Sequence, residues 1–183
     1  MKNIVLKKTF FQRPTLEAAE DLLGKFLVKK TEQGEVAVMI TEVEAYDGPK
    51  DKASHASCGL TDRNAIMFGE GGYFYVYLCY GMYEMLNIVT GQKNYPAAIL
   101  LRGAEILGEE EKRLNGPGKL TKFLNINRAV NKKLADKITG LWFEDRGVKI
   151  SPKYIERTSR IGVAYAGPIW LKKKYRFVLT KLE

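Results

Sequence analysis

The stretch Tyr73-Phe-Tyr-Val-Tyr-Leu-Cys-Tyr-Gly-Met-Tyr-Glu-Met-Leu-Asn-Ile-Val-Thr90 decides the fold. Residues 73–78 are aromatic and β-branched with few exceptions, a composition that favours strands. Residues 79–82 then predict the reversal of a hairpin, and residues 84–90 predict its return strand. A hairpin in the middle of the chain makes an antiparallel sheet the natural centre of the fold.

Further strands are expected on both sides of this hairpin. Residues 26–30 and 36–45 form two strands around a turn at Gln33-Gly34, and the other expected strands are 97–102, 141–143 (with 148–150 beyond a turn at 145–147), 161–165 and 176–180. Short helices are predicted from Pro14 to a stop at Gly24, at about 104–114 and at 118–125. Strands dominate and the helices follow no regular alternation, so the prediction is an α+β fold with a mostly antiparallel sheet surrounded by short helices.

Composition limits the class of protein. With 183 residues and neither a repeat nor a linker, the chain is expected to form one compact domain over residues 1–183. Thirty Lys and Arg against 21 Asp and Glu give a net charge of +9, which favours a polyanionic partner as well as a plain basic surface. Two cysteines cannot build a disulfide framework. No apolar run approaches ~20 residues, so a soluble, cytoplasmic protein without membrane contact is expected.

The second strand leads to a candidate catalytic group. If its alternation holds, Val36, Val38, Ile40, Glu42, Glu44 and Tyr46 share one face, apolar at one end and acidic-aromatic at the other. Glu44 would then leave the core beside an aromatic ring, where a partly screened carboxylate can act as a general base. The alternative is a solvated carboxylate at a strand end. His55 is the only histidine, either structural or folded back opposite Tyr46.

The tyrosines of the first strand and the residues of the turn predict different roles. Tyr73 and Tyr75 are expected to belong to the core of the sheet. Tyr80-Gly-Met82 is harder to explain as structure, because reversals normally carry Gly, Asn or Asp. Apolar side chains at such a tip predict a wedge between base pairs or, alternatively, a protein contact.

Other charged segments give less specific signals. Gly116-Pro-Gly-Lys119 before a helix is typical of an anion site, but also of an ordinary helix start. Lys172 to Lys174 is either a solvated run or a phosphate contact. The carboxylates of residues 42, 44, 47 and 51 raise the alternative of a two-metal nuclease, but the segment lacks a tight acidic ligand pattern. No metal and no cofactor are expected.

Taken together, these segments resemble the alkyladenine (3-methyladenine) DNA glycosylase family. The resemblance runs in order along nearly the whole chain, through Glu42-Val-Glu44-Ala-Tyr46-Asp-Gly-Pro49, Ser54-His55, Thr61-Asp-Arg63-Asn64-Ala-Ile-Met67-Phe68-Gly69, Tyr75-Val-Tyr77-Leu-Cys-Tyr80-Gly-Met82-Tyr83, Leu86-Asn87-Ile-Val-Thr-Gly91, Ala97-Ala-Ile-Leu-Leu-Arg102, Asn115-Gly-Pro-Gly-Lys-Leu120, Arg160-Ile-Gly-Val163 and Tyr165-Ala-Gly167. It departs from the usual family pattern at residues 57–60, 103–106 and 168–174, outside the inferred catalytic set.

The resemblance implies a monomeric, monofunctional enzyme of base excision repair, nucleoid-associated if the source is bacterial. Its partner would be double-stranded DNA that contains damaged purines of the 3-methyladenine, 7-methylguanine, hypoxanthine and ethenoadenine class. It would flip the alkylated or deaminated base and hydrolyse the N-glycosidic bond. By family analogy Glu44 activates the water and Arg102 helps to hold it; the base-binding residues are Tyr46, His55, Tyr77 and Asn87, the intercalating residues Tyr80 and Met82, and the backbone contacts Arg63, Tyr83 and Lys119.

Two rival readings remain. The first is a non-catalytic nucleic-acid-binding module of the same fold, in which Glu44 is structural. The second is an RNA-binding module related to the C-terminal domain of formyltransferases, because that basic domain has a similar fold. Binding alone needs no buried carboxylate, so Glu44 with Tyr46 and His55 favours the enzyme.

Overall fold

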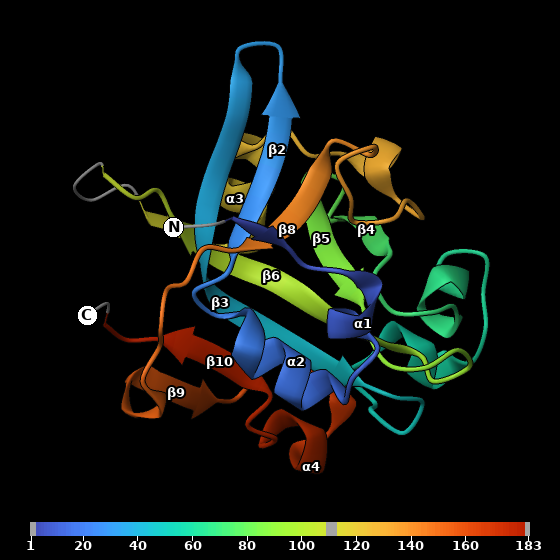
Figure 1. Cartoon of the computed structure of the whole chain (residues 1–183). Helices are drawn as coiled ribbons and strands as arrows, with labels where there is room; N and C mark the ends of the chain where they lie inside the picture. Colours follow the sequence, from blue (N-terminus) through green and yellow to red (C-terminus); the bar gives the residue numbers. More distant parts are fainter. Residues whose placement is uncertain (1–2, 109–112, 182–183) are drawn as a thin grey trace.

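In the part of the chain that the structure describes, an antiparallel sheet of ten strands forms the centre of the fold (Figure 1). The computed structural model describes residues 3–108 and 113–181. Along the main path the strand order is β1-β8-β2-β3-β6-β5-β4, while β10 pairs with β3 and β9, and β7 pairs with β6. The strands are β1 Ile4–Val5, β2 Phe26–Thr31, β3 Gly34–Asp47, β4 Phe74–Cys79, β5 Tyr83–Val89, β6 Ala97–Glu105, β7 Arg113–Asn115, β8 Leu141–Asp145, β9 Ile155–Thr158 and β10 Arg176–Leu179.

The described residues form four short α-helices around the sheet: α1 Lys8–Phe11, α2 Thr15–Leu22, α3 Pro117–Phe123 and α4 Pro168–Leu171. Figure 1 shows α1 and α2 in front of the sheet and α3 behind the β2–β3 hairpin. Buried side chains of α2 and α3 nevertheless join one apolar core with those of β3, β6 and β8. The expected α+β class with a mostly antiparallel sheet and short helices is therefore confirmed. Among the described residues, no helix has the length and apolar character needed to cross a membrane.

In the middle of the long strand β3, the alternation of side chains between the two faces of the sheet is interrupted. Its pairing with β6 shifts register between Ile40 and Val43, which marks a β-bulge. Val38 and Ile40 before the bulge and Val43 and Ala45 after it all enter the same core. The expected uninterrupted alternation from Val36 to Tyr46 is thus wrong, because the bulge reverses the parity. As a result, the acidic and aromatic side chains after the bulge turn away from the apolar core.

The bulge also separates two neighbours of β3. Residues 34–39 pair with β2, whereas residues 42–44 pair with β10, which comes from the other end of the chain. The C-terminal half of β3 therefore lies between β6 on one side and β10 on the other. This arrangement brings residues 160–176 beside the acidic end of β3.

The hairpin predicted from residues 73–90 is confirmed as β4 and β5. Its turn has a bond from the Met82 N–H to the Cys79 carbonyl (3.1 Å), with positive φ at Tyr80 (51°) and Gly81 (69°). Two central residues with positive φ define a type I′ turn, which fits the twist of a hairpin but favours Asn-Gly. Tyr80 therefore has a left-handed backbone conformation, which residues other than glycine rarely adopt.

Several predicted elements need correction. The helix at 104–114 is wrong: Ala104 and Glu105 extend β6 by pairing with β3, and Arg113–Asn115 returns as β7, with residues 109–112 outside the described part. The strand at 161–165 is also wrong, because Gly162 bends the chain at φ +76° before a 3-10 turn at Ala164–Ala166. Residues 148–150 form no strand, and β9 was not predicted. Helix α2, followed by Gly24 at φ +76°, and α3 match their predictions.

Candidate active site

Glu44 is a completely buried carboxylate on β3, just after the bulge. Its Oε1 accepts a hydrogen bond from the Ile161 backbone N–H (2.7 Å), and its Oε2 accepts one from the Tyr46 hydroxyl (2.9 Å). Burial raises the pKa of Glu44, while Arg102 and these two hydrogen bonds act in the opposite direction. The expectation of a partly screened strand-end carboxylate is corrected: the group is fully enclosed.

Two arginines meet a second carboxylate beside Glu44. The Nε atoms of Arg102 on β6 and Arg176 on β10 lie 2.9 Å and 2.7 Å from Oε1 of Glu42. The Arg102 Nε is also 3.5 Å from Glu44 Oε1, so one guanidinium faces both carboxylates. The structure thus brings Arg102 beside Glu44, and its predicted role in holding the water stays a prediction. Its bond to Glu42 fixes its orientation toward Glu44.

An aromatic pocket adjoins the Glu44–Tyr46 end of β3. The pocket is lined by Tyr46, Ala53, Ser54, His55, Met67, Tyr75, Tyr77, Asn87, Ala98 and Tyr165. Tyr46, His55, Tyr77 and Asn87 were predicted to lie together, and the structure brings all four to this pocket. The other six lining residues were not predicted here, and the largest of their side chains are those of Met67, Tyr75 and Tyr165. Tyr75 is buried as expected for the core, but its hydroxyl also faces His55.

His55 begins the 3-10 turn His55–Cys58 that follows β3. Its Nδ1 lies 2.8 Å from the Tyr75 hydroxyl, and its ring meets that of Tyr77 edge to face at 4.7 Å between centroids. Burial, helped by the charge of Arg63, lowers the pKa of His55. Burial also raises the pKa values of Tyr46 and Tyr77, so both phenols stay protonated near neutrality. The aromatic side chains that line the pocket are therefore uncharged near neutrality.

Asn87 forms the polar part of the pocket. Its Nδ2 donates to the backbone carbonyls of Tyr75 (3.0 Å) and Met85 (3.2 Å), and the residue is only 3% exposed. These bonds occupy its amide hydrogens and fix the rotamer. The predicted role of Asn87, which is to exclude bases by their exocyclic groups, stays a prediction.

The hairpin tip carries apolar side chains into solvent. Tyr80 is 88% exposed and Met82 68% exposed, as their expected place at the tip requires. Tyr83 is half-exposed, and its ring packs over α3, where a Cβ at Gly118 would lie 2.7 Å from the ring. Lys119 follows on α3 and is exposed. Tyr83 and Lys119 thus lie in one groove with Met82.

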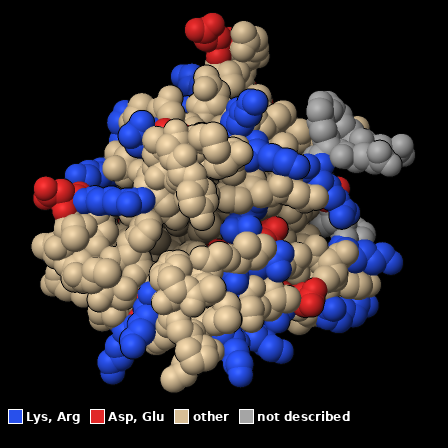
Figure 2. Space-filling model, turned by 180° about the vertical axis from the view of Figure 1, so that it is seen from behind, with Lys and Arg blue, Asp and Glu red and all other residues tan. Residues whose placement is uncertain are grey.

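Arg63, which was predicted to contact the DNA backbone, lies beside the aromatic pocket. Its guanidinium is 4.9 Å from the centre of the Tyr77 ring, and it interacts electrostatically with Tyr75 and His55. The side chain is exposed on its other side. Basic side chains are also frequent on the face shown in Figure 2, where they surround a hollow and far outnumber acidic ones.

Sequence reasoning did not predict the contribution of the C-terminal region. Ile161 supplies a hydrogen bond to Glu44, and the buried Arg160 stacks on Tyr46 at 4.7 Å. The only signal was their place within the segment that resembles the glycosylase family. Within residues 3–108 and 113–181, no three His, Cys, Asp or Glu side chains lie close enough to hold a metal ion.

Comparison with known proteins shows the same family over nearly the whole chain. Residues 9–183 match the family model for methylpurine-DNA glycosylase. Proteins named "Putative 3-methyladenine DNA glycosylase" are similar: that of Methanocella arvoryzae is 48% identical over 89% of this chain and 86% of its own length. The one from Sodalis glossinidius is 45% identical over 89% and 92%, and that of Rickettsia peacockii is 42% identical over 99% and 93%. This chain belongs to the methylpurine-DNA glycosylase family.

Proposed function

We propose that this DNA glycosylase removes alkylated or deaminated purines from duplex DNA by hydrolysis of the N-glycosidic bond, as the first step of base excision repair. The proposed substrates are bases of the 3-methyladenine, 7-methylguanine, hypoxanthine and ethenoadenine class. The observation that carries the proposal is a buried carboxylate, Glu44, at the side of an uncharged aromatic pocket. Binding alone would not require a carboxylate to be removed from water at that place.

In this proposal the damaged nucleotide leaves the stack and its base enters the pocket. Extrusion costs a few kcal/mol, and less when the base is badly paired. Tyr46, His55 and Tyr77 then surround the base, while Tyr80 and Met82 fill the space that it leaves in the duplex. A cationic alkylated purine is attracted by aromatic faces. Arg63, Tyr83 and Lys119 would contact the sugar-phosphate backbone beside it.

The chemical step needs one water molecule and one general base, a group that accepts a proton from that water. Glu44 accepts a proton from the water, whose oxygen bonds to the anomeric carbon of the sugar as the bond from that carbon to the purine nitrogen breaks. The bond electrons leave with the purine and neutralise a cationic alkylated base. Arg102, held by Glu42, would orient the water and keep Glu44 ionised. A neutral purine would also need a proton as it departs.

The test is release of free base from a duplex that carries one defined lesion. Glu44→Gln keeps the size of the side chain but removes the proton acceptor. We expect single-turnover excision to fall by at least ~100-fold, the usual scale of general-base catalysis, with lesion binding retained. Glu144→Gln is the matched control, because Glu144 is another buried strand carboxylate paired with an arginine. Excision by Glu44→Gln within a few-fold of the unmodified enzyme would reject the proposed role.

A further inference from the structure

A second buried ion pair, Asp51–Arg160, lies next to the reacting carboxylate. Both side chains have no measurable exposure, and the pair has two parallel hydrogen bonds, Nη2 to Oδ1 at 2.8 Å and Nη1 to Oδ2 at 2.5 Å. The Arg160 Nη1 also donates to the Ala45 carbonyl at 2.8 Å. Its guanidinium lies 4.7 Å from the centre of the Tyr46 ring and 5.2 Å from that of the Tyr175 ring. Arg160 is thereby fixed to β3 immediately after Glu44.

This anchor determines where the next peptide group lies. The Ile161 N–H donates to Glu44 Oε1 at 2.7 Å, yet residues 159–163 belong to no strand or helix. Beyond Ile161 the chain turns at Gly162, with φ +76°. Sheet pairing therefore does not hold this N–H against the carboxylate. β9 ends at Thr158, and the Tyr165 hydroxyl donates to the Ala53 carbonyl at 2.8 Å on the far side of the turn. Between these contacts, the Arg160 side chain, bonded to the Ala45 carbonyl and to Asp51, holds the segment on β3 directly beside Ile161.

Asp51 extends the same contact to the pocket wall. Its Oδ2 accepts from the Asp47 N–H and its Oδ1 from the Ala53 N–H, both at 3.1 Å. The Asp51 carbonyl accepts from the Ser54 N–H at 2.8 Å. These bonds shape the loop between β3 and His55. One ion pair thus joins the loop that presents His55 to the segment that bonds to Glu44.

Stability alone gives little reason for this pair. Taking two charges out of water is costly, and well-packed apolar residues in such places are often neutral or more stable. In addition, the Arg160 Nε is buried and has no hydrogen-bond partner among the described residues. A pair selected for stability would satisfy that donor. The geometry therefore favours a role in positioning other groups.

We propose that Arg160 and Asp51 are positioning residues for the excision reaction: Arg160 holds the Ile161 N–H against Glu44, and Asp51 ties that segment to the loop that presents His55. Neither side chain acts on the substrate. This inference rests on the proposed function of Glu44 as the base. The inference explains why Glu44 needs the segment of Arg160 and Ile161, which lies more than 100 residues away in the chain.

The positioning role has a readout that structural damage would not change. The Ile161 hydrogen bond lowers the pKa of Glu44, so a displaced Ile161 would raise it. The other charged or titratable groups near Glu44 are Glu42, Tyr46, Arg102, Tyr165 and, on the paired strand β10, Arg176, and Arg160→Lys replaces none of them. Arg160→Lys keeps the positive charge but loses the planar two-pronged contact. It should shift the acid limb of the pH–rate profile upward.

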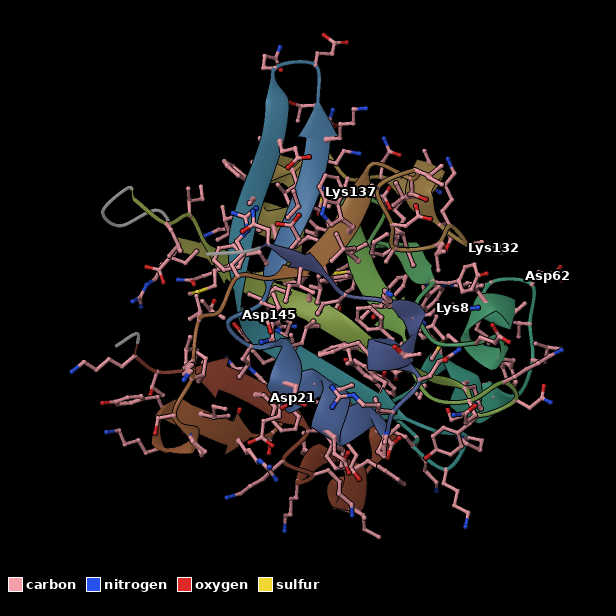
Figure 3. All side chains as sticks on the ribbon, viewed as in Figure 1. Lys8, Asp21, Asp62, Lys132, Lys137 and Asp145 are labelled. Carbon is pink, nitrogen blue, oxygen red and sulfur yellow. The ribbon has the colours of Figure 1, made fainter. Side chains whose placement is uncertain are left out.

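The experiment compares Arg160→Lys and Asp51→Asn with two controls, Arg146→Lys and Glu144→Gln, which alter the ion pair on β8. Figure 3 labels Asp145, the last residue of β8 and the sequence neighbour of both control residues, and the sheet order places β8 two strands from β3. Single-turnover excision, binding to a lesion duplex and melting temperature are measured for each. We expect at least ~10-fold slower excision in both Arg160→Lys and Asp51→Asn, on the scale of small misplacements in active sites. The controls should lose stability without slower excision.

A wild-type rate and an unchanged acid limb in Arg160→Lys, with only a lower melting temperature, would overturn the inference. If Arg160→Lys does not fold, Asp51→Asn decides by the same criteria. The double variant should lose less than the product of the two single losses, because both break one contact. The proposed function fails separately: it fails if Glu44→Gln remains active. An inactive Glu44→Gln with an unaltered Arg160→Lys rejects only the positioning role.

Discussion

The Tyr46 hydroxyl donates a 2.9 Å hydrogen bond to Oε2 of Glu44, two residues earlier on the same strand. Side chains two apart on a strand point to the same face, so the bond requires no bend of the backbone. It joins a wall of the aromatic pocket directly to the proposed base. Tyr46 therefore has two separable parts: a ring that is proposed to contact the flipped nucleobase and a hydroxyl that donates a hydrogen bond to the Glu44 carboxylate.

Tyr46→Phe separates these parts. The ring remains, so binding to a lesion duplex should hardly change. Loss of the hydroxyl removes a hydrogen bond that lowers the pKa of Glu44, and the pKa should rise further. Because only ionised Glu44 accepts a proton, the acid limb of the single-turnover pH–rate profile should move to higher pH. An unchanged limb, measured between about pH 5 and pH 9, would show that the hydroxyl does not act on the base.

Glu44 should also reduce the stability of the folded protein. Its pKa is higher in the folded state than in the unfolded chain, so the folded state binds more protons and stability falls as pH rises through this interval. Glu44→Gln should remove that dependence. The variant should melt at a higher temperature near neutral pH, by about 2–4 °C for each kcal/mol gained. The difference from the unmodified protein should shrink below the ordinary glutamate pKa of about 4.3.

The reaction should leave an abasic strand without a covalent enzyme intermediate. No lysine is among the pocket-lining residues of the described chain, so a Schiff base with the sugar has no evident amine. Borohydride added during excision should trap no protein–DNA adduct on a denaturing gel. A trapped adduct would require a nucleophilic amine and a revised mechanism.

Local sequence was enough to predict the hairpin, while the family resemblance assigned Tyr77 and Asn87 on it to the pocket. Tyr77, Asn87 and Tyr80 lie on one hairpin, whose strand and turn signals are within eighteen residues. His55 folds back to the pocket within nine residues of Tyr46, as its position allowed. The residues that came together were thus those linked by short segments. Their roles in binding and excision stay predictions.

Two features depend on distant contacts, and the sequence did not predict them. The bulge at residues 40–43 is a shift in the register between β3 and β6. It depends on the partner strand, and no pattern within β3 reveals it. Arg160 and Ile161 reach Glu44 from more than 100 residues away because β10 takes the place of β2 beside β3. The strand that was wrongly predicted at 161–165 gave no indication of this contact. Tertiary pairing here outweighs local propensity.

The tip residue Tyr80 offers a test of how the duplex is opened. It has positive φ (51°) in a type I′ turn and is 88% exposed, so the ring contributes little to folding. If it fills the space left by the flipped base, Tyr80→Ala should weaken the flipped complex by roughly 1–3 kcal/mol, the scale of base–aromatic stacking. Alanine replaces another non-glycine residue at the same φ, so backbone strain should change little. The melting temperature should stay nearly constant.

The lesion context decides whether the ring acts as a wedge. A lesion in a well-stacked pair should lose more affinity in Tyr80→Ala than one opposite a mismatch, because extrusion from a mismatch already costs less. Lys119→Ala should instead weaken all duplexes alike and reduce the salt dependence, as loss of a phosphate contact does. Ile4→Ala is the control for an exposed apolar side chain, on β1, which pairs with β8 and not with the hairpin. A large drop in the melting temperature of Tyr80→Ala with unaltered lesion selectivity would place the ring in the folded core and reject the wedge.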